Sequence, residues 1–166
     1  MSRKLIASAA ALLLGTAAQA DMIAGWDVST KPDSDGVCSI QHNYIDKNDG
    51  DAKNSVVFTF GKAKDGTSIL VMVFGYSKWD WTKGDKATAD LIVGDTVEHR
   101  AANWEAATTN VLVGTFSGAD PLLQPISRAT QIALRFDGDK DNEAWFEIPD
   151  AGQAIGAVQI CRGQIK

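Results

Sequence analysis

The sequence predicts an all-β protein, a β-sandwich of about eight or nine antiparallel strands that ends in a short α-helix. Three observations predict this fold class. Apolar and polar residues alternate with period two through most of the chain after residue 20, as in strands with one face in a core. Turns that contain Gly or Asp separate these stretches at short intervals. Near the C-terminus, the apolar positions change to helical spacing.

The first 20 residues have the pattern of a cleaved export signal. Arg3 and Lys4 give a positively charged start. An apolar run from Leu5 to Leu14 follows, and residues 18–20 (Ala-Gln-Ala) form a small-x-small cleavage site. The run is too short to be a transmembrane segment, because a bilayer needs about 20 apolar residues. We therefore expect residues 1–20 to be a signal peptide and residues 21–166 to form one domain of a periplasmic or secreted protein.

The charge of the chain argues against nucleic acid as a partner. The whole chain has a formal net charge of −5, and removal of the signal peptide leaves 14 basic residues against 21 acidic ones, a net charge of −7. Such a surface repels nucleic acid and anionic lipid head groups. A cationic partner is compatible with this charge.

Cys38 and Cys161 are the only cysteines in the chain. Because an export signal implies an oxidising compartment, we expect them to form one disulfide. The alternative is two buried free thiols. A metal site is a weaker interpretation, because the two cysteines are far apart and neither belongs to a C-x-x-C pair.

The first predicted strands are the most regular. From Cys38 to Tyr44, every second residue belongs to a more apolar face that includes Ile40 and His42. Residues 56–60 form an apolar face with Val56, Phe58 and Phe60, and Asp65-Gly66 predicts a hairpin turn. Residues 69–74 are apolar on both faces, which is typical of a central strand that is covered on each side.

The later strands follow the same alternation of apolar and polar residues. They are predicted at residues 87–93, 96–101, 111–116, 130–136 and 145–148. A Gly94-Asp95 turn separates the first two of these, and a polar link precedes the last.

Two segments depart from the strand pattern. Residues 119–129 carry Pro121 and Pro125, which predicts a loop or a short helical turn, because proline cannot donate to a strand ladder. After Asp150, a predicted N-cap, helical spacing relates a set of five apolar residues. They are Ala151, Ala154, Ile155, Val158 and Cys161. The inner face of this helix would present Cys161 to Cys38 on an early strand.

The two histidines do not indicate a catalytic site. His42 lies on the face of its strand that holds Cys38 and Ile40, where we expect a hydrogen-bonded core histidine. His99 lies between Glu98 and Arg100, which is typical of a solvated strand face, with a catalytic role as the alternative. No G-x-S-x-G motif occurs, and the 21 acidic residues single out no glycosidase pair. We expect neither catalysis nor a cofactor.

Two acidic turns have some features of calcium loops. Residues 46–51 and the series Asp137, Asp139 and Asp141 each bring several carboxylates together. Neither turn has the glutamate at the twelfth position that an EF-hand needs. We expect solvated hairpin loops and no metal site, with weak calcium binding as the alternative.

Aromatic residues are the remaining candidates for a binding site. Tyr76, Trp79 and Trp81 lie within six residues of one another, among charged residues. Exposed aromatic rings stack on sugars or on the side chains of a partner, which makes these three the candidate contact residues. The alternative is that they fill the core or close its ends, as we expect of Trp26 and Trp145.

Several motifs occur in an order that is similar to that of a known family. A tryptophan strand (residues 25–28, Gly-Trp-Asp-Val) follows the cleavage site, and Cys38 and several hairpins come next. Residues 145–148 (Trp-Phe-Glu-Ile) then lead into a helix with Gly and Ala at residues 152–158. This order resembles the invasion-associated locus B family of bacterial secreted proteins, although the chain lacks a second, central cysteine pair. The resemblance implies a β-sandwich of the periplasm or cell surface that is linked to host-cell entry and has no known active site.

Together, these features predict an exported protein that binds a protein or a component of the cell envelope. One alternative is a small periplasmic inhibitor of a cationic enzyme such as a lysozyme, because the acidic charge would assist their encounter. Another is a carbohydrate-binding module that uses Trp79 and Trp81. An enzyme that depends on His99 is the last alternative.

Overall fold

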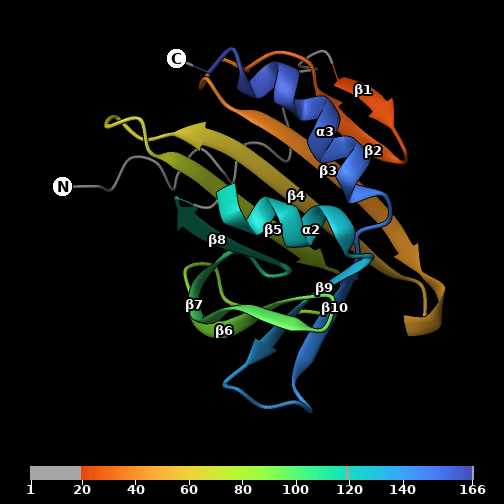
Figure 1. The fold of residues 1–166 in the computed structure, drawn as a ribbon. Coiled ribbons are helices and arrows are strands. Elements are labelled where there is room, and N and C mark those ends of the chain that lie inside the picture. Colours follow the sequence, from red (N-terminus) through yellow and green to blue (C-terminus); the bar gives the residue numbers. More distant parts are fainter. Residues whose placement is uncertain (1–19, 119, 166) are drawn as a thin grey trace.

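The computed structural model describes residues 20–118 and 120–165 and is built around ten antiparallel strands (Figure 1). Apart from Ala20, the predicted signal peptide lies outside the described residues. The strands are β1 (Ala20–Ile23), β2 (Trp26–Ser29), β3 (Cys38–Asp46), β4 (Ala52–Lys62), β5 (Ser68–Tyr76), β6 (Lys86–Val93), β7 (Thr96–Thr108), β8 (Val111–Ser117), β9 (Gln131–Phe136) and β10 (Glu143–Glu147). The helices are α2 (Asp120–Arg128), α3 (Ala151–Arg162) and a 3-10 turn, η2 (Lys47–Asp49). The predicted all-β class and C-terminal helix are confirmed.

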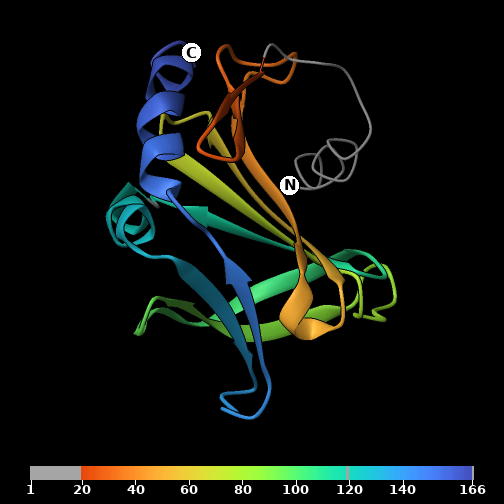
Figure 2. The ribbon, with the colours of Figure 1, turned by 90° about the vertical axis from the view of Figure 1, so that its right-hand side faces the viewer.

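All ten strands belong to one sheet, in the order β1-β2-β3-β4-β5-β8-β7-β6-β9-β10. The sheet turns a corner, so that β6 and β7 cross beneath the upright strands β3 to β5 in Figure 2. At the corner, Gly114 of β8 lies opposite Trp104 of β7. A Cβ atom on Gly114 would lie only 2.6 Å from Cζ3 of Trp104, so glycine leaves room for the indole ring.

The bend brings one end of the sheet back against its middle, which gives a sandwich-like arrangement around one main core. The rings of Phe74 on β5 and Phe146 on β10 lie 4.8 Å apart. The hydroxyl of Tyr44 on β3 accepts a hydrogen bond of 2.8 Å from the backbone N–H of Glu147 and one of 3.1 Å from Nδ2 of Asn54. Burial raises the pKa of this hydroxyl. The contacts of Phe146 and Glu147 join β10 to β5 and β3, which are far from it in the sheet order.

The predicted alternation of the early strands is confirmed. Val56, Phe58 and Phe60 of β4 and Leu70, Met72 and Phe74 of β5 face the main core. On the opposite face of β5, Val73 packs with Val57 and Val111 in a second, smaller cluster. The run 69–74 is therefore apolar on both faces because it contributes to both clusters.

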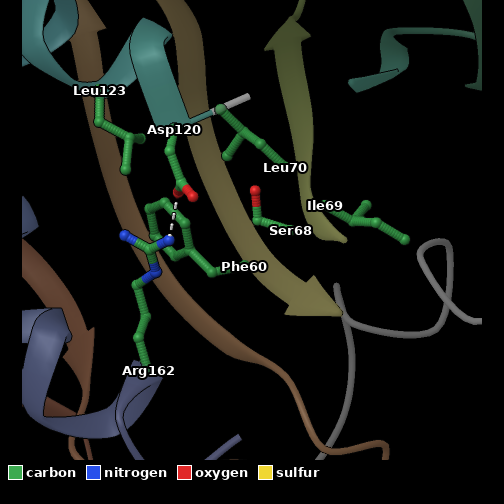
Figure 3. A pocket seen from close by; sticks show the side chains of 7 residues that line it. All are labelled: Phe60, Ser68, Ile69, Leu70, Asp120, Leu123 and Arg162. Carbon is green, nitrogen blue, oxygen red and sulfur yellow. Dashed lines mark hydrogen bonds and ion pairs between the residues drawn. The ribbon is translucent and has the colours of Figure 1, made fainter. Parts of the chain in front are cut away.

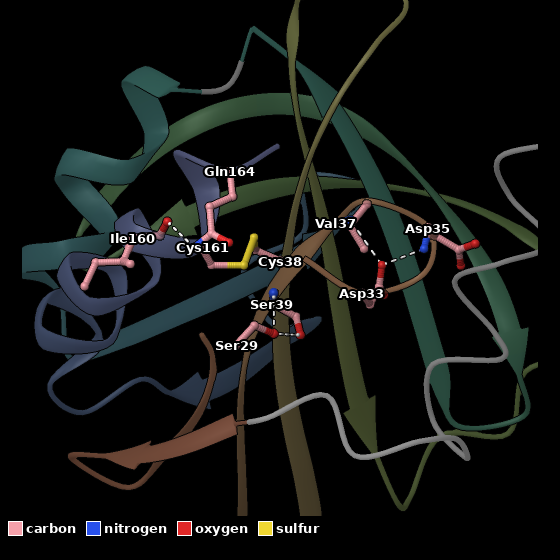
Figure 4. Close-up of a disulfide and its surroundings, with 9 residues drawn as sticks. All are labelled: Ser29, Asp33, Asp35, Val37, Cys38, Ser39, Ile160, Cys161 and Gln164. Atoms are coloured by element: carbon pink, nitrogen blue, oxygen red, sulfur yellow. Dashed lines mark hydrogen bonds between the residues drawn. A yellow bond between two sulfur atoms is a disulfide. The ribbon is translucent and has the colours of Figure 1, made fainter. Parts of the chain in front are cut away.

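The C-terminal helix α3 packs on β2 and β3 and is fastened there by the predicted disulfide (Figure 4). Cys38 and Cys161 are bonded, with Cα atoms 6.0 Å apart. The five residues predicted to form its inner face are the buried ones: Ala151, Ala154, Ile155, Val158 and Cys161. At the other end of the helix, Nε1 of Trp26 donates a 2.7 Å hydrogen bond to the carbonyl oxygen of Pro149.

Asp150 occupies the predicted N-cap position, but its side chain does not cap the helix. Its backbone is left-handed, with φ of 53°, and its side chain makes no capping hydrogen bond. An N-cap side chain reaches the first amides of the helix from an extended backbone, and the left-handed conformation of Asp150 does not aim it there.

The segment around Pro121 and Pro125 forms α2, a helix of nine residues where a loop or a short helical turn was predicted. Pro121 lies in the first turn, where the backbone N–H groups of a helix have no partner within it. Only Pro125 therefore removes a hydrogen bond of the helix. Arg162 of α3 ties the two helices together. Its guanidinium lies over the ring of Phe60 at 4.9 Å and donates a 2.6 Å hydrogen bond to Asp120 (Figure 3). This bond lowers the pKa of Asp120.

Candidate contact surface

The three candidate contact residues form one aromatic cluster, which we call the Tyr76 cluster (Tyr76, Trp79 and Trp81). Tyr76 ends β5, and the connection to β6 places both tryptophans beside it. Ring centroids lie 5.7 Å apart between Tyr76 and Trp79 and 6.4 Å apart between Trp79 and Trp81. The backbone N–H of Trp79 donates to the carbonyl of Tyr76 at 3.1 Å, and that of Trp81 donates to Thr109 at 2.7 Å. The position of the cluster is thus set by backbone bonds as well as by ring packing.

The inner side of the Tyr76 cluster closes one end of the main core. Trp79 lies edge-on to Phe146 at 5.8 Å and to Phe136 at 6.3 Å. Trp81 packs against Phe136 at 5.9 Å. All three residues of the cluster are partly buried, so each also keeps some exposed surface. The structure therefore combines the two alternatives that the sequence left open, a closure of the core and a surface patch.

Asp49 connects the cluster to the first acidic turn. The hydroxyl of Tyr76 donates a 2.5 Å hydrogen bond to Oδ2 of Asp49, and Nζ of Lys78 lies 2.6 Å from Oδ1. The bond to Asp49, together with partial burial, raises the pKa of Tyr76 to about 12. The bonds from Lys78 and then Tyr76 lower the pKa of Asp49. Sequence reasoning missed this role of Asp49, because 27 residues separate it from Tyr76 and no local pattern links them.

In each acidic turn, a carboxylate accepts hydrogen bonds from the backbone of the turn itself. The side chain of Asp46 accepts hydrogen bonds from the backbone N–H groups of Asn48 and Asp49 and so caps η2. In the second turn, Asp139 accepts a 2.9 Å bond from the N–H of Asp141. Within residues 20–118 and 120–165, no group of three or more metal-ligating side chains is found.

His42 and His99 lie in different environments. Nδ1 of His42 is 2.9 Å from the carbonyl oxygen of Gly25, and its ring lies 5.1 Å from that of Trp26 and 5.3 Å from that of Tyr44. The predicted hydrogen bond is present, but His42 is half-buried and is not one of the buried residues of the main core. His99 is exposed, and its ring meets that of Phe116 edge-on at 5.4 Å.

His99 lines an open cleft of about 320 Å³ between β7, the end of β8 and the start of α2. The other lining residues include Asn103, Ser117 and Pro121. Among the described residues that line this cleft, His99 is the only titratable one. A hydrolytic site would need a second acid or base there to orient the histidine.

The two tryptophans that were expected in the core behave differently. Trp26 is fully buried, as predicted. The prediction for Trp145 is wrong, because 42% of it is exposed. On β10, Phe146 is the residue that faces the core, and neighbouring residues of a strand point to opposite faces.

Comparison of the chain with protein-family models, curated proteins and solved structures finds no match. In the described part of the chain, no helix is long and apolar enough to cross a membrane.

Proposed function

We propose that this chain is a non-catalytic binding protein of the bacterial periplasm or cell surface, similar in kind to the invasion-associated locus B proteins. Its partner is a protein or another component of the cell envelope. The Cys38–Cys161 disulfide is compatible with an exported protein. The contact surface that we propose is the exposed side of the Tyr76 cluster, together with the neighbouring Lys78 and Asp80.

The observation that carries this proposal is the rigid support of the cluster. Its rings rest on Phe136 and Phe146, and Asp49 holds both Tyr76 and Lys78 through hydrogen bonds. Binding energy at interfaces is concentrated in aromatic and charged residues that are already in their bound conformation, because little side-chain entropy is then lost. The exposed charges of Lys78 and Asp80 flank the rings and can select the partner.

Site-specific photocrosslinking in the producing cell tests the proposal directly. A photoreactive residue is placed at Lys78 or Asp80, and at Lys64 as a matched control. All three are exposed, but Lys64 lies in the turn before β5, at the opposite end of that strand from Tyr76. We expect discrete adducts with an envelope component at positions 78 and 80 and none at position 64. Equal labelling at all three positions, or no adduct, would contradict the proposal.

Affinity for the partner identified in this way gives the second measurement. Lys78→Glu should weaken binding about tenfold, because it reverses a charge beside the rings and removes the ion pair with Asp49, whereas Lys64→Glu should have almost no effect. Equal affinities of the two variants would show that the Tyr76 cluster is only a closure of the core.

A further inference from the structure

A second aromatic surface lies on the opposite face of β10. Trp145 points away from the core, and its neighbours on that face are Glu143 and Glu147, two residues before and after it. β10 is the last strand of the sheet order, and β9 is its ladder neighbour. The β9–β10 hairpin extends away from both helices in Figure 2. The strand thus presents an exposed tryptophan between two carboxylates.

The indole ring of Trp145 is held in one orientation by an ordered row of charges. Nε1 of Trp145 donates a 2.9 Å hydrogen bond to Oε2 of Glu143. The other oxygen of Glu143 accepts a 2.6 Å bond from Nε of Arg135, and the side chains of this pair are only 13% and 19% exposed. Asp90 lies opposite Arg135 in the β6–β9 register and accepts a 2.8 Å bond from the N–H of Ala101. The charged residues therefore follow one another across β10, β9 and β6.

A second, apolar row runs beside the charges and supports the ring. Ala133 lies directly opposite Trp145 in the β9–β10 register, and Ile92 lies opposite Ala133. Both are buried although they are on the outer face of the sheet. A ring that is fixed by a hydrogen bond and lies over buried apolar residues loses little conformational freedom when it binds a ligand.

We infer that Trp145 and Glu147 form a binding site for a cationic side chain, lysine or arginine, of a protein partner. Tryptophan is the aromatic residue that attracts cations most strongly over its face. Arg135 already neutralises Glu143, whereas exposed Glu147 makes no ion pair among the described residues and remains available to the incoming charge. The formal net charge of −5 favours the approach of a basic partner.

This site is separate from the Tyr76 cluster, which packs on the core side of β10 through Phe146. Its test therefore does not depend on the proposed function. The chain has five tryptophans, so 5-fluorotryptophan labelling yields a ¹⁹F NMR spectrum simple enough to assign. Trp145→Phe, which keeps an aromatic ring, identifies the resonance of Trp145.

Titration of the labelled protein with tetralysine amide and tetra-arginine amide provides the measurement. We expect a saturable shift of the Trp145 resonance that disappears in 0.5 M salt as the charges are screened. Glu147→Gln should weaken binding about two- to fivefold, whereas Asp95→Asn, the same charge change in the exposed β6–β7 turn, should leave it unchanged. Both substitutions are at exposed positions, so neither should disturb the fold.

Two results would overturn the inference. One is the absence of a saturable shift of the Trp145 resonance, or equal weakening by Glu147→Gln and Asp95→Asn. The other is a shift induced by a neutral oligosaccharide, such as tetra-N-acetylchitotetraose, that does not depend on salt. That outcome would assign the ring to stacking on sugars.

Discussion

Removal of the Cys38–Cys161 disulfide should be the most destabilising small change in this protein. The bond joins residues that are 123 positions apart, so it closes almost the whole domain into one loop. In the chain-entropy model, a loop of this length is worth about 5 kcal/mol of stability at 25 °C. With an unfolding entropy of about 2 cal/mol/K per residue, the corresponding decrease in Tm is about 15 °C.

The assay is urea unfolding of residues 21–166, followed by tryptophan fluorescence and by far-UV circular dichroism. The double variant Cys38→Ala/Cys161→Ala is compared with wild type that has been fully reduced. The reduced wild type retains both sulfur atoms, which are fully buried, so the difference between these two samples measures packing alone. The m-value should also rise when the bond is absent, because the open unfolded chain exposes more surface.

A loss below about 2 kcal/mol in both samples would refute this reasoning. It would mean that the hydrogen bond from Trp26 to Pro149 and the packing of α3 on β2 and β3 already hold the tail in place. Separate transitions for fluorescence and circular dichroism would have another meaning. They would show that α3 detaches from the sheet before the rest of the domain unfolds.

Two further predictions concern the packing of α3 on α2 and the hydrogen bond between Tyr76 and Asp49. In α3, Gly152→Ala should destabilise the protein by about 1–3 kcal/mol, because its Cβ atom would lie 2.5 Å from the carbonyl oxygen of Ser127. Gly156→Ala on the same helix meets no atom within 4 Å and should stabilise it by up to about 1 kcal/mol, so equal effects in thermal unfolding would contradict the packing of α2 on α3. The pKa of Tyr76 is raised to about 12, so its bond to Asp49 stabilises the fold below pH 10 and is lost as the pH rises from 10 to 12. Wild type should therefore lose more stability than Tyr76→Phe over this interval in urea unfolding, and parallel curves for the two proteins would contradict the Tyr76–Asp49 bond.

The sequence predicted the local structure well because most of it depends on short-range periodicity. The five inner positions of α3 follow from helical spacing alone, and the faces of β3 and β4 follow from alternation. The strand order could not be predicted in this way. β8 lies between β5 and β7, and β6 lies between β7 and β9. This order depends on packing between segments that no local sequence pattern connects.

The error at Trp145 has a different cause, because the sequence did contain the relevant signal. Alternation places Trp145 on the same face as Glu143 and Glu147, and places Phe146 on the opposite face. The prediction that Trp145 lies in the core or closes its ends did not follow this alternation. The position of an aromatic residue within the strand period is a better guide to its burial than its hydrophobicity.

The same strand therefore contributes to two surfaces with different chemistry. On its inner face, Phe146 supports Trp79 and closes the core. On its outer face, Glu143 orients the exposed ring of Trp145. Because the Tyr44 hydroxyl bonds to the backbone N–H of Glu147, the position of β10 is coupled to that of β3, which carries Cys38. Loss of the disulfide should thus loosen the support of both surfaces, and weaker peptide binding at Trp145 in the reduced protein would reveal this coupling.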